Sequence, residues 1–225
     1  NYSRSDLDNF AMLSQQKASL AIAKGRFQSQ IVPIEIKRGR QTSVFDTDEH
    51  VRSDATVEGL SMLKPAFQKD GLVTAGNASG LNDGAAAMLL TSKSEAQNRQ
   101  LTIKASFKSY AFSGVNPGVM GLGPIKAVKL ALLKAGLSMP DIDVIESNEA
   151  FAAQAMAVND ELNIDAAKVN PNGGAIAMGH PVGATGSILI VKLLAELDRI
   201  DGRYGLATMC IGGGQGIALI IERNK

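Results

Sequence analysis

The sequence predicts a layered α/β fold, in which helices pack against a sheet. Short apolar strands alternate with helices of about 10 to 13 residues through the second half of the chain, and this alternation is typical of a layered α/β fold. Hydrophobic residues make up 45% of the sequence and charged residues 20%, a balance that favours a buried core over disorder. With 225 residues, the chain can form one large domain or two modest ones.

Composition excludes several classes of protein. Twenty-three Lys and Arg against 22 Asp and Glu are too balanced for a nucleic-acid groove. No apolar run reaches the roughly 20 residues of a membrane helix, and the polar stretch Asn1–Asp8 is unlike a signal peptide. The single cysteine, Cys210, suits a reducing compartment, and two histidines are too few for a typical structural zinc site. We therefore expect a cytoplasmic protein without a bound metal, a nucleic-acid partner or a membrane partner.

The first hundred residues contain one clear amphipathic helix, which has nothing before it to pack against. Apolar residues recur at three- and four-residue spacing from Leu7 to Ile22, and Gly25 stands where the helix would end. Residues 38–71 are mixed and rich in loop-forming residues. The remaining segments are expected to be strands at Ile31–Lys37, Leu72–Ala75 and Gly84–Thr91, the last of them buried, and a polar helix at Lys93–Gln100.

Beyond residue 101 the pattern becomes regular. The expected strands are Thr102–Tyr110, Val144–Glu146, Gly205–Met209 and Ile217–Glu222. The expected helices are Ile125–Ala135, Ala150–Leu162 and Ser187–Leu197. The last two strands should form an antiparallel hairpin.

Three segments share a layout in which a polar side chain is followed by glycine or by the start of a helix. They are Val144–Phe151, Gly179–Gly186 and Cys210–Gly216. Because strand ends in α/β folds converge on a crevice, we expect Asn148, His180 and Cys210 to lie near one another.

His180 is suited to proton transfer near neutral pH. The following proline favours extended backbone at His180, and Gly183 and Gly186 allow the main chain to approach a ligand. The alternative is a structural histidine in a tight turn.

Cys210 precedes a run of glycines whose amides can hold an oxyanion and can lower the pKa of the thiol. The alternative is a small buried hydrophobic residue. Asn148 has an alternative role as a helix N-cap. Two other features are interpreted as surface: His50, and the cationic cluster Lys37–Arg40, which can meet phosphates but is more often a solvated turn.

Together these segments resemble the thiolase family, in particular its biosynthetic acetyl-CoA acetyltransferases. The matching stretches are Asn148–Ala153 (NEAFAA), Asn170–Gly186 (NPNGGAIAMGHPVGATG), Cys210–Gly216 (CIGGGQG), Thr74–Ala87 (TAGNASGLNDGAAA) and Gly25–Pro33 (GRFQSQIVP). Several long motifs in the correct order make the resemblance specific, and it extends along the whole chain. It implies a thiolase-like layered α/β fold, a mixed five-stranded sheet with helices on both faces, plus part of an α/β loop domain.

The resemblance implies a reversible condensation of two acetyl-CoA molecules to acetoacetyl-CoA and CoA. Cys210 then corresponds to the family's acid/base cysteine, and His180 to the base that activates the nucleophile and that also donates a hydrogen bond to the thioester oxygen. Asn148 would hold the water of the first oxyanion hole, and the Gly212 N–H would serve the second. The alternatives are a 3-ketoacyl-CoA thiolase of fatty-acid degradation and a non-catalytic CoA-binding fragment.

The resemblance also implies a set of CoA contacts, with CoA as a substrate and not a permanently bound cofactor. Arg52 would lie near the adenine, Phe67, Ala75 and Ser79 along the pantetheine channel, and Met120, Ala150 and Phe151 around the acyl pocket. Gly59 stands where close relatives often have a serine near CoA. The Val119–Gly121 stretch is more similar to the short-chain biosynthetic enzymes than to the degradative ones.

Thiolases carry their nucleophilic cysteine in an N-terminal half, and this sequence has no second cysteine. The resemblance divides the chain into part of the CoA-binding loop domain (1–82), a remnant of the N-terminal core domain (83–101) and the C-terminal core domain (102–225). We therefore expect a missing N-terminal half or a companion chain, an inactive isolated chain, and a homo-oligomer, dimer or tetramer, in the intact enzyme.

Overall fold

The computed structural model describes residues 1–224, and its centre is a mixed sheet with the strand order β3-β6-β5-β4. The strands are β3 (Ala105–Gly114), β4 (Val144–Ser147), β5 (Tyr204–Ile211) and β6 (Gln215–Arg223). β4 runs parallel to β5, whereas β6 is antiparallel to both β3 and β5. A single parallel bridge between Ile145 and Val169 continues the sheet beyond β4. Within residues 1–224, the fifth expected strand is reduced to this bridge.

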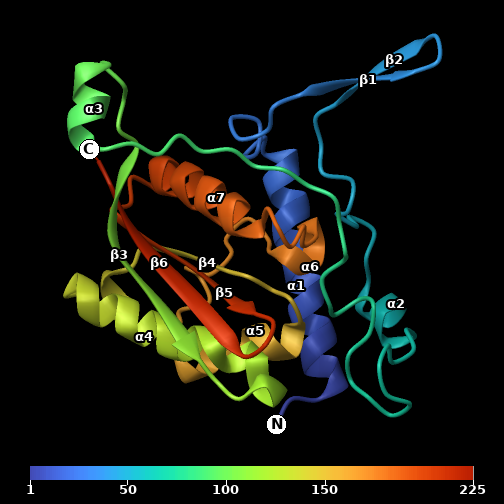
Figure 1. Ribbon diagram of the computed structural model, residues 1–225. Coiled ribbons are helices and arrows are strands. Elements are labelled where there is room, and N and C mark those ends of the chain that lie inside the picture. The colour runs from blue at the N-terminus through green and yellow to red at the C-terminus, as the bar shows by residue number, and fades with distance from the viewer. Residues whose placement is uncertain (225) are drawn as a thin grey trace.

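Helices cover both faces of the sheet, as the family resemblance implies (Figure 1). On one face, Ile145, Leu206 and Ile220 pack with α4 (Gly123–Ala135) and with the helix α5 (Ala152–Glu161). On the other face, the adjacent residues Val144, Ala207 and Ile221 pack with α7 (Thr185–Ile200). Neighbouring strand residues therefore enter different cores, because side chains alternate between the two faces of a strand.

The first helix, α1 (Arg4–Ala23), has its packing partners later in the chain. It begins with a capping box, in which Ser3 and Asp6 exchange side-chain and backbone hydrogen bonds. Its buried face, which includes Leu7 and Ala11, packs against α2 (Val57–Ser61), α5 and the short helix α6 (Ala175–Met178). The helix α1 therefore lies beside α5, which follows the Val144–Phe151 motif, and beside α6, which precedes the Gly179–Gly186 motif.

The remaining elements lie at the periphery. β1 (Ile34–Arg38) and β2 (Gln41–Phe45) form an antiparallel hairpin that projects from the body of the molecule (Figure 1). The sequence predicts the first of these strands but misses the second. The other short elements are α3 (Lys93–Asn98) and the 3₁₀ helices η1 (Pro117–Leu122) and η2 (Met139–Asp141). Among residues 1–224, no helix has the length and apolar character needed to cross a bilayer.

Two predicted strands are wrong. In Leu72–Ala75, Thr74 makes only an isolated bridge with Pro65. Gly84–Thr91 has no regular secondary structure and is mostly exposed, with Leu89 78% exposed. A run of Ala and Gly becomes a strand only where a neighbouring strand pairs its N–H and C=O groups. No strand within residues 1–224 pairs with this segment.

Leu193 should contribute strongly to the stability of the sheet. It is fully buried between α7 and the sheet, so Leu193→Ala leaves a cavity and should lower the free energy of unfolding by about 2–5 kcal/mol. The matched control is Leu133→Ala on α4, where the side chain is 76% exposed and the change should stay within about 0.5 kcal/mol. Urea titration followed by circular dichroism measures both, and equal losses would contradict the packing described.

Candidate active site

The backbone of His180 is held by the loop at residues 80–82. Its N–H lies 3.2 Å from the carbonyl oxygen of Gly80 and 3.2 Å from Oδ1 of Asn82. Gly179 ends α6 with a positive φ of 92°, and a Cβ added there would lie only 2.3 Å from Asn82 Oδ1. Only glycine fits this position, because both the conformation and the space exclude a side chain. No sequence pattern singles out Asn82, although it lies within the matching stretch 74–87.

The imidazole of His180 joins two elements. Its Nδ1 lies 2.6 Å from Oγ1 of Thr185, and its Nε2 lies 3.4 Å from Nδ2 of Asn148. The ring is half-buried, and this burial lowers the pKa of His180 below its ordinary value, because desolvation disfavours the imidazolium. A neutral ring at pH 7 can accept a proton. The structure therefore brings His180 and Asn148 together, as the sequence predicts.

Asn148 follows β4, and its backbone N–H donates to the Thr208 carbonyl over 2.9 Å. The residue is only 1% exposed, and its Oδ1 is buried with no hydrogen-bond partner among the described residues. The alternative role as a helix N-cap is wrong, because Phe151 is the N-cap of α5. A buried unpaired oxygen costs about 1–3 kcal/mol. Such a group is expected to take up a water or a ligand hydrogen-bond donor.

Cys210 lies near the end of β5 and pairs with Gly216 of β6. Thr208, which binds the Asn148 backbone, is two residues earlier on β5, so Asn148 and Cys210 lie at the same end of the parallel pair β4–β5. The residue is 7% exposed, and burial raises the pKa of its thiol. The run of glycine amides predicts a lowered pKa for this thiol. The pKa is raised instead, because the desolvation of the thiolate has a larger effect than hydrogen bonds from the backbone. At neutral pH Cys210 is therefore a thiol.

Gly212 lies in the exposed turn between β5 and β6. The two glycines after it have positive φ angles of 86° and 92°. The Gly214 carbonyl accepts a hydrogen bond from Val115 N–H over 2.7 Å, which fixes the turn against the end of β3. The oxyanion role of the Gly212 N–H remains a prediction.

Five of the expected CoA contacts gather around the start of α5. The Ser79 N–H donates to the Ala150 carbonyl over 3.0 Å. The rings of Phe67 and Phe151 meet edge to face, with centroids 6.2 Å apart. Met120 lies on η1, which packs against α5, whereas Ala75 lies in an exposed turn.

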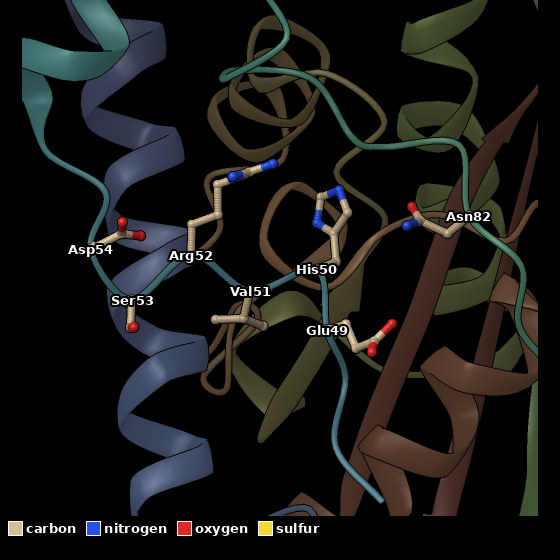
Figure 2. Close-up of a pocket in the computed structure, with 7 residues that line it drawn as sticks. All are labelled: Glu49, His50, Val51, Arg52, Ser53, Asp54 and Asn82. Carbon is tan, nitrogen blue, oxygen red and sulfur yellow. The ribbon is translucent and has the colours of Figure 1, made fainter. Parts of the chain in front are cut away.

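Arg52 lines an open cleft of about 410 Å³ (Figure 2). The cleft is lined by Glu49, His50, Val51, Arg52, Ser53, Asp54 and Asn82. Asn82 joins this cleft to the His180 backbone through the hydrogen bond described above. The backbone N–H of Arg52 is anchored by Oε1 of Gln15 over 2.9 Å.

The expectation that His50 is a surface residue is wrong. Its Nδ1 lies 2.9 Å from the Ala177 carbonyl oxygen, and the side chain is half-buried. A Cβ added at Gly80 would lie 2.3 Å from its Nε2, so His50 packs directly on the loop that holds His180. No pattern local to His50 in the sequence indicates this contact.

A network of buried polar contacts holds these motifs in place. The Glu149 carboxylate accepts hydrogen bonds from Ser14 Oγ (2.7 Å) and Asn170 Nδ2 (2.8 Å). Lys192 of α7 forms a buried ion pair with Glu146 over 2.6 Å and also donates to the Gly173 carbonyl. Within residues 1–224, no cluster of three or more His, Cys, Asp or Glu side chains is arranged to hold a metal ion.

Two family models match the chain: "Thiolase, C-terminal domain" over residues 101–223 and "Thiolase, N-terminal domain" over residues 1–94. The chain is 56% identical to the beta-ketothiolase BktB of Cupriavidus necator over 223 residues, covering 98% of this chain and 56% of the relative. It is also 56% identical to the acetyl-CoA acetyltransferase of Pseudomonas aeruginosa over 222 residues, covering 98% and 56%. The chain therefore spans little more than half the length of these relatives.

Solved structures agree with these matches. The acetyl-CoA acetyltransferase of Bacillus anthracis superposes with a TM-score of 0.96 at 48% identity, covering 99% of this chain and 56% of that one. The human mitochondrial 3-ketoacyl-CoA thiolase superposes with a TM-score of 0.93 at 44% identity, with the same coverage. The predicted fold class is thus confirmed, and the chain belongs to the thiolase family.

Proposed function

We propose that this chain supplies the acid/base half of an acetyl-CoA C-acetyltransferase, which condenses two acetyl-CoA molecules reversibly to acetoacetyl-CoA and CoA. The observation that carries the proposal is the pairing of a neutral imidazole with a buried amide. His180 Nε2 lies 3.4 Å from Asn148 Nδ2, and Asn148 Oδ1 is left without a partner. Relatives named acetyl-CoA acetyltransferase or beta-ketothiolase support the substrate class.

The first half-reaction requires a nucleophile that this sequence does not contain, since Cys210 is its only cysteine. A thiol from a companion segment would give its proton to His180 and attack the carbonyl carbon of acetyl-CoA. The carbon–sulfur bond to CoA then breaks. A buried Cys210 thiol with a raised pKa is suited to protonate the departing CoA thiolate, which leaves Cys210 ionised.

In the second half-reaction, the Cys210 thiolate removes a proton from the methyl group of a second acetyl-CoA. The resulting carbanion attacks the acyl carbon, a carbon–carbon bond forms, and the nucleophile leaves as a thiolate that recovers its proton from His180. A water held by Asn148 would stabilise the oxyanion of the first step, and the Gly212 N–H would stabilise that of the second. His180 and Cys210 thus each end the cycle in the protonation state in which they began it.

The wider setting is part of the same proposal. The intact enzyme would comprise a nucleophile-bearing N-terminal half, the loop domain 1–82, the remnant 83–101 and the C-terminal core domain 102–225. It would act in the cytoplasm as a dimer or tetramer, without a resident metal. The acetoacetyl-CoA type is favoured over the degradative 3-ketoacyl-CoA type because the 56% identity to beta-ketothiolase and acetyl-CoA acetyltransferase sequences exceeds the 44% to the human 3-ketoacyl-CoA thiolase.

The direct test joins this chain to the N-terminal part of the Pseudomonas aeruginosa relative and measures thiolysis of acetoacetyl-CoA. The joined protein should be active, and Cys210→Ala should reduce turnover by about 10²–10⁴-fold because the acid/base group is removed. Acetylation of the nucleophile should still be detected by intact mass in the variant. An inactive joined protein that nevertheless binds CoA would favour the non-catalytic alternative, and full condensation activity in Cys210→Ala would contradict the role of the thiol.

Arg52 should contribute to CoA affinity and not to turnover. In the joined protein, Arg52→Ala should raise KM for CoA about tenfold, because a charge-assisted contact contributes about 1.5 kcal/mol, with kcat unchanged. The matched control is Arg99→Ala, which removes the same charge from an exposed ion pair with Glu95 on α3. A fall in kcat at constant KM would contradict the binding role.

The raised pKa of Cys210 predicts a pH dependence that this chain can report without a companion. Only the thiolate reacts with iodoacetamide, so alkylation of Cys210 at pH 7.5 should be slower than that of an unfolded control peptide. The rate should keep rising above pH 8.5, the ordinary thiol range. Mass spectrometry identifies the product without ambiguity, since no other cysteine is present. A rate that levels off below pH 8 would show a lowered pKa instead.

A further inference from the structure

The hydroxyl group of Thr185 lies between two polar groups at the start of α7. Thr185 is 3% exposed and is the first residue of this helix. Its Oγ1 is 2.6 Å from His180 Nδ1 and 2.9 Å from the carbonyl oxygen of Pro181. Both distances are within hydrogen-bonding range.

The direction of these two hydrogen bonds is restricted by chemistry. A carbonyl oxygen can only accept, and a hydroxyl group has one hydrogen to donate. If the Thr185 hydroxyl donates to Pro181, its oxygen must accept from His180. The proton of that second bond then belongs to Nδ1 of the imidazole.

The contact on the other side of the ring agrees with this arrangement. Nε2 of His180 faces Nδ2 of Asn148, which is a donor and has no lone pair to offer. With the amide in this orientation Nε2 is the acceptor, and in a neutral ring the proton is then on Nδ1. In the opposite tautomer, the Nε2–H group of His180 would face the Nδ2–H group of Asn148. The Thr185 hydroxyl would then donate to Nδ1 and could not donate to the Pro181 carbonyl.

The surroundings keep the ring neutral and Thr185 fixed. Burial lowers the pKa of His180, and the positive end of the 16-residue helix α7 also disfavours a cation beside it. The Pro181 carbonyl additionally accepts the backbone N–H groups of Ala184 and Thr185, over 2.8 and 2.9 Å. The turn that begins α7 thus sets the position of the Thr185 hydroxyl.

We propose that Thr185 is a positioning residue that holds His180 as the Nδ1–H tautomer, so that the lone pair of Nε2 faces Asn148. The consequence for catalysis rests on the proposed function: Nε2 is then the atom that receives the proton of the nucleophilic thiol. A wrong tautomer leaves the geometry intact but presents an N–H where a base is needed.

The tautomer can be measured directly on this chain, without a companion segment or activity. Long-range ¹H–¹⁵N spectra of the ¹⁵N-labelled chain at pH 7.5 distinguish protonated from unprotonated ring nitrogens. His180 and His50 are the only histidines, so a His50→Gln sample assigns both. Nδ1 of His180 should appear protonated and Nε2 unprotonated. A His180 ring protonated at Nε2 would overturn the proposal.

Two variants separate the hydroxyl from mere packing. Thr185→Val keeps the branched shape and removes the hydroxyl, and it should shift the His180 spectrum toward the Nε2–H form or an average of both. Thr185→Ser keeps the hydroxyl and should retain the spectrum of the parent. An unshifted spectrum in Thr185→Val would overturn the proposal. If this variant does not fold, the spectrum of the parent chain decides alone.

Kinetics of the joined protein provide a second readout. Thr185→Val should lower kcat by about 10- to 100-fold with KM for acetyl-CoA unchanged, and Thr185→Ser should restore it. Loss of kcat without a change of tautomer would overturn the positioning role. A joined protein that is inactive although the parent chain has the expected tautomer would contradict the proposed function and leave the assignment for Thr185 supported.

Discussion

One buried carboxylate, Glu149, connects three parts of the chain that meet at the site. It accepts hydrogen bonds from Ser14 on α1, from Asn170 in the loop after the Val169 bridge and from the Ile176 N–H on α6. Gly174 approaches so closely that an added Cβ would lie 2.1 Å from the carboxyl carbon. Because Glu149 directly follows Asn148, the same contacts that fix α6 also fix the amide facing His180. Leaving such buried partners unpaired costs about 1–3 kcal/mol each, so the alternatives to this geometry are disfavoured.

A second set of polar contacts supports the same loop from α7. Lys192 is paired with Glu146 and also donates to the Gly173 carbonyl. Asn172 accepts a hydrogen bond from Arg26 and donates one to Glu196. Buried polar networks of this kind tend to specify one arrangement more than they add stability. The segment 170–180 is thereby bound to α1, β4 and α7 at once, which accounts for the short distances around the imidazole.

The sequence predicts what depends on local pattern and fails where distant partners decide. The strands β4 to β6 and the helices α4, α5 and α7 follow from periodicity, since their apolar residues mark the faces that are buried. Gly84–Thr91 has the composition of a buried strand but no pairing strand within residues 1–224. The missed strand β2 is exposed along its length, so it lacks the alternation that periodicity detects.

The candidate site shows the same division. The motifs identify Asn148, His180 and Cys210, but the roles of Asn82 and Thr185 depend on hydrogen bonds that only the folded chain defines. The predicted direction of the Cys210 pKa shift is wrong, because a run of glycines in the sequence does not reveal how deeply the thiol is buried. In the proposed reaction, a thiol that starts protonated and an imidazole that starts neutral are complementary, since one would first give a proton and the other would first accept one.

The most direct measurement is a crystal structure of the joined protein with acetyl-CoA bound. The account predicts the methyl carbon of the acetyl group within about 4 Å of Cys210 Sγ, and the carbonyl oxygen of the acylated nucleophile within about 3.2 Å of His180 Nε2 or of a water held by Asn148. A methyl group directed away from Cys210, with the imidazole of His180 in a separate cavity, would contradict it.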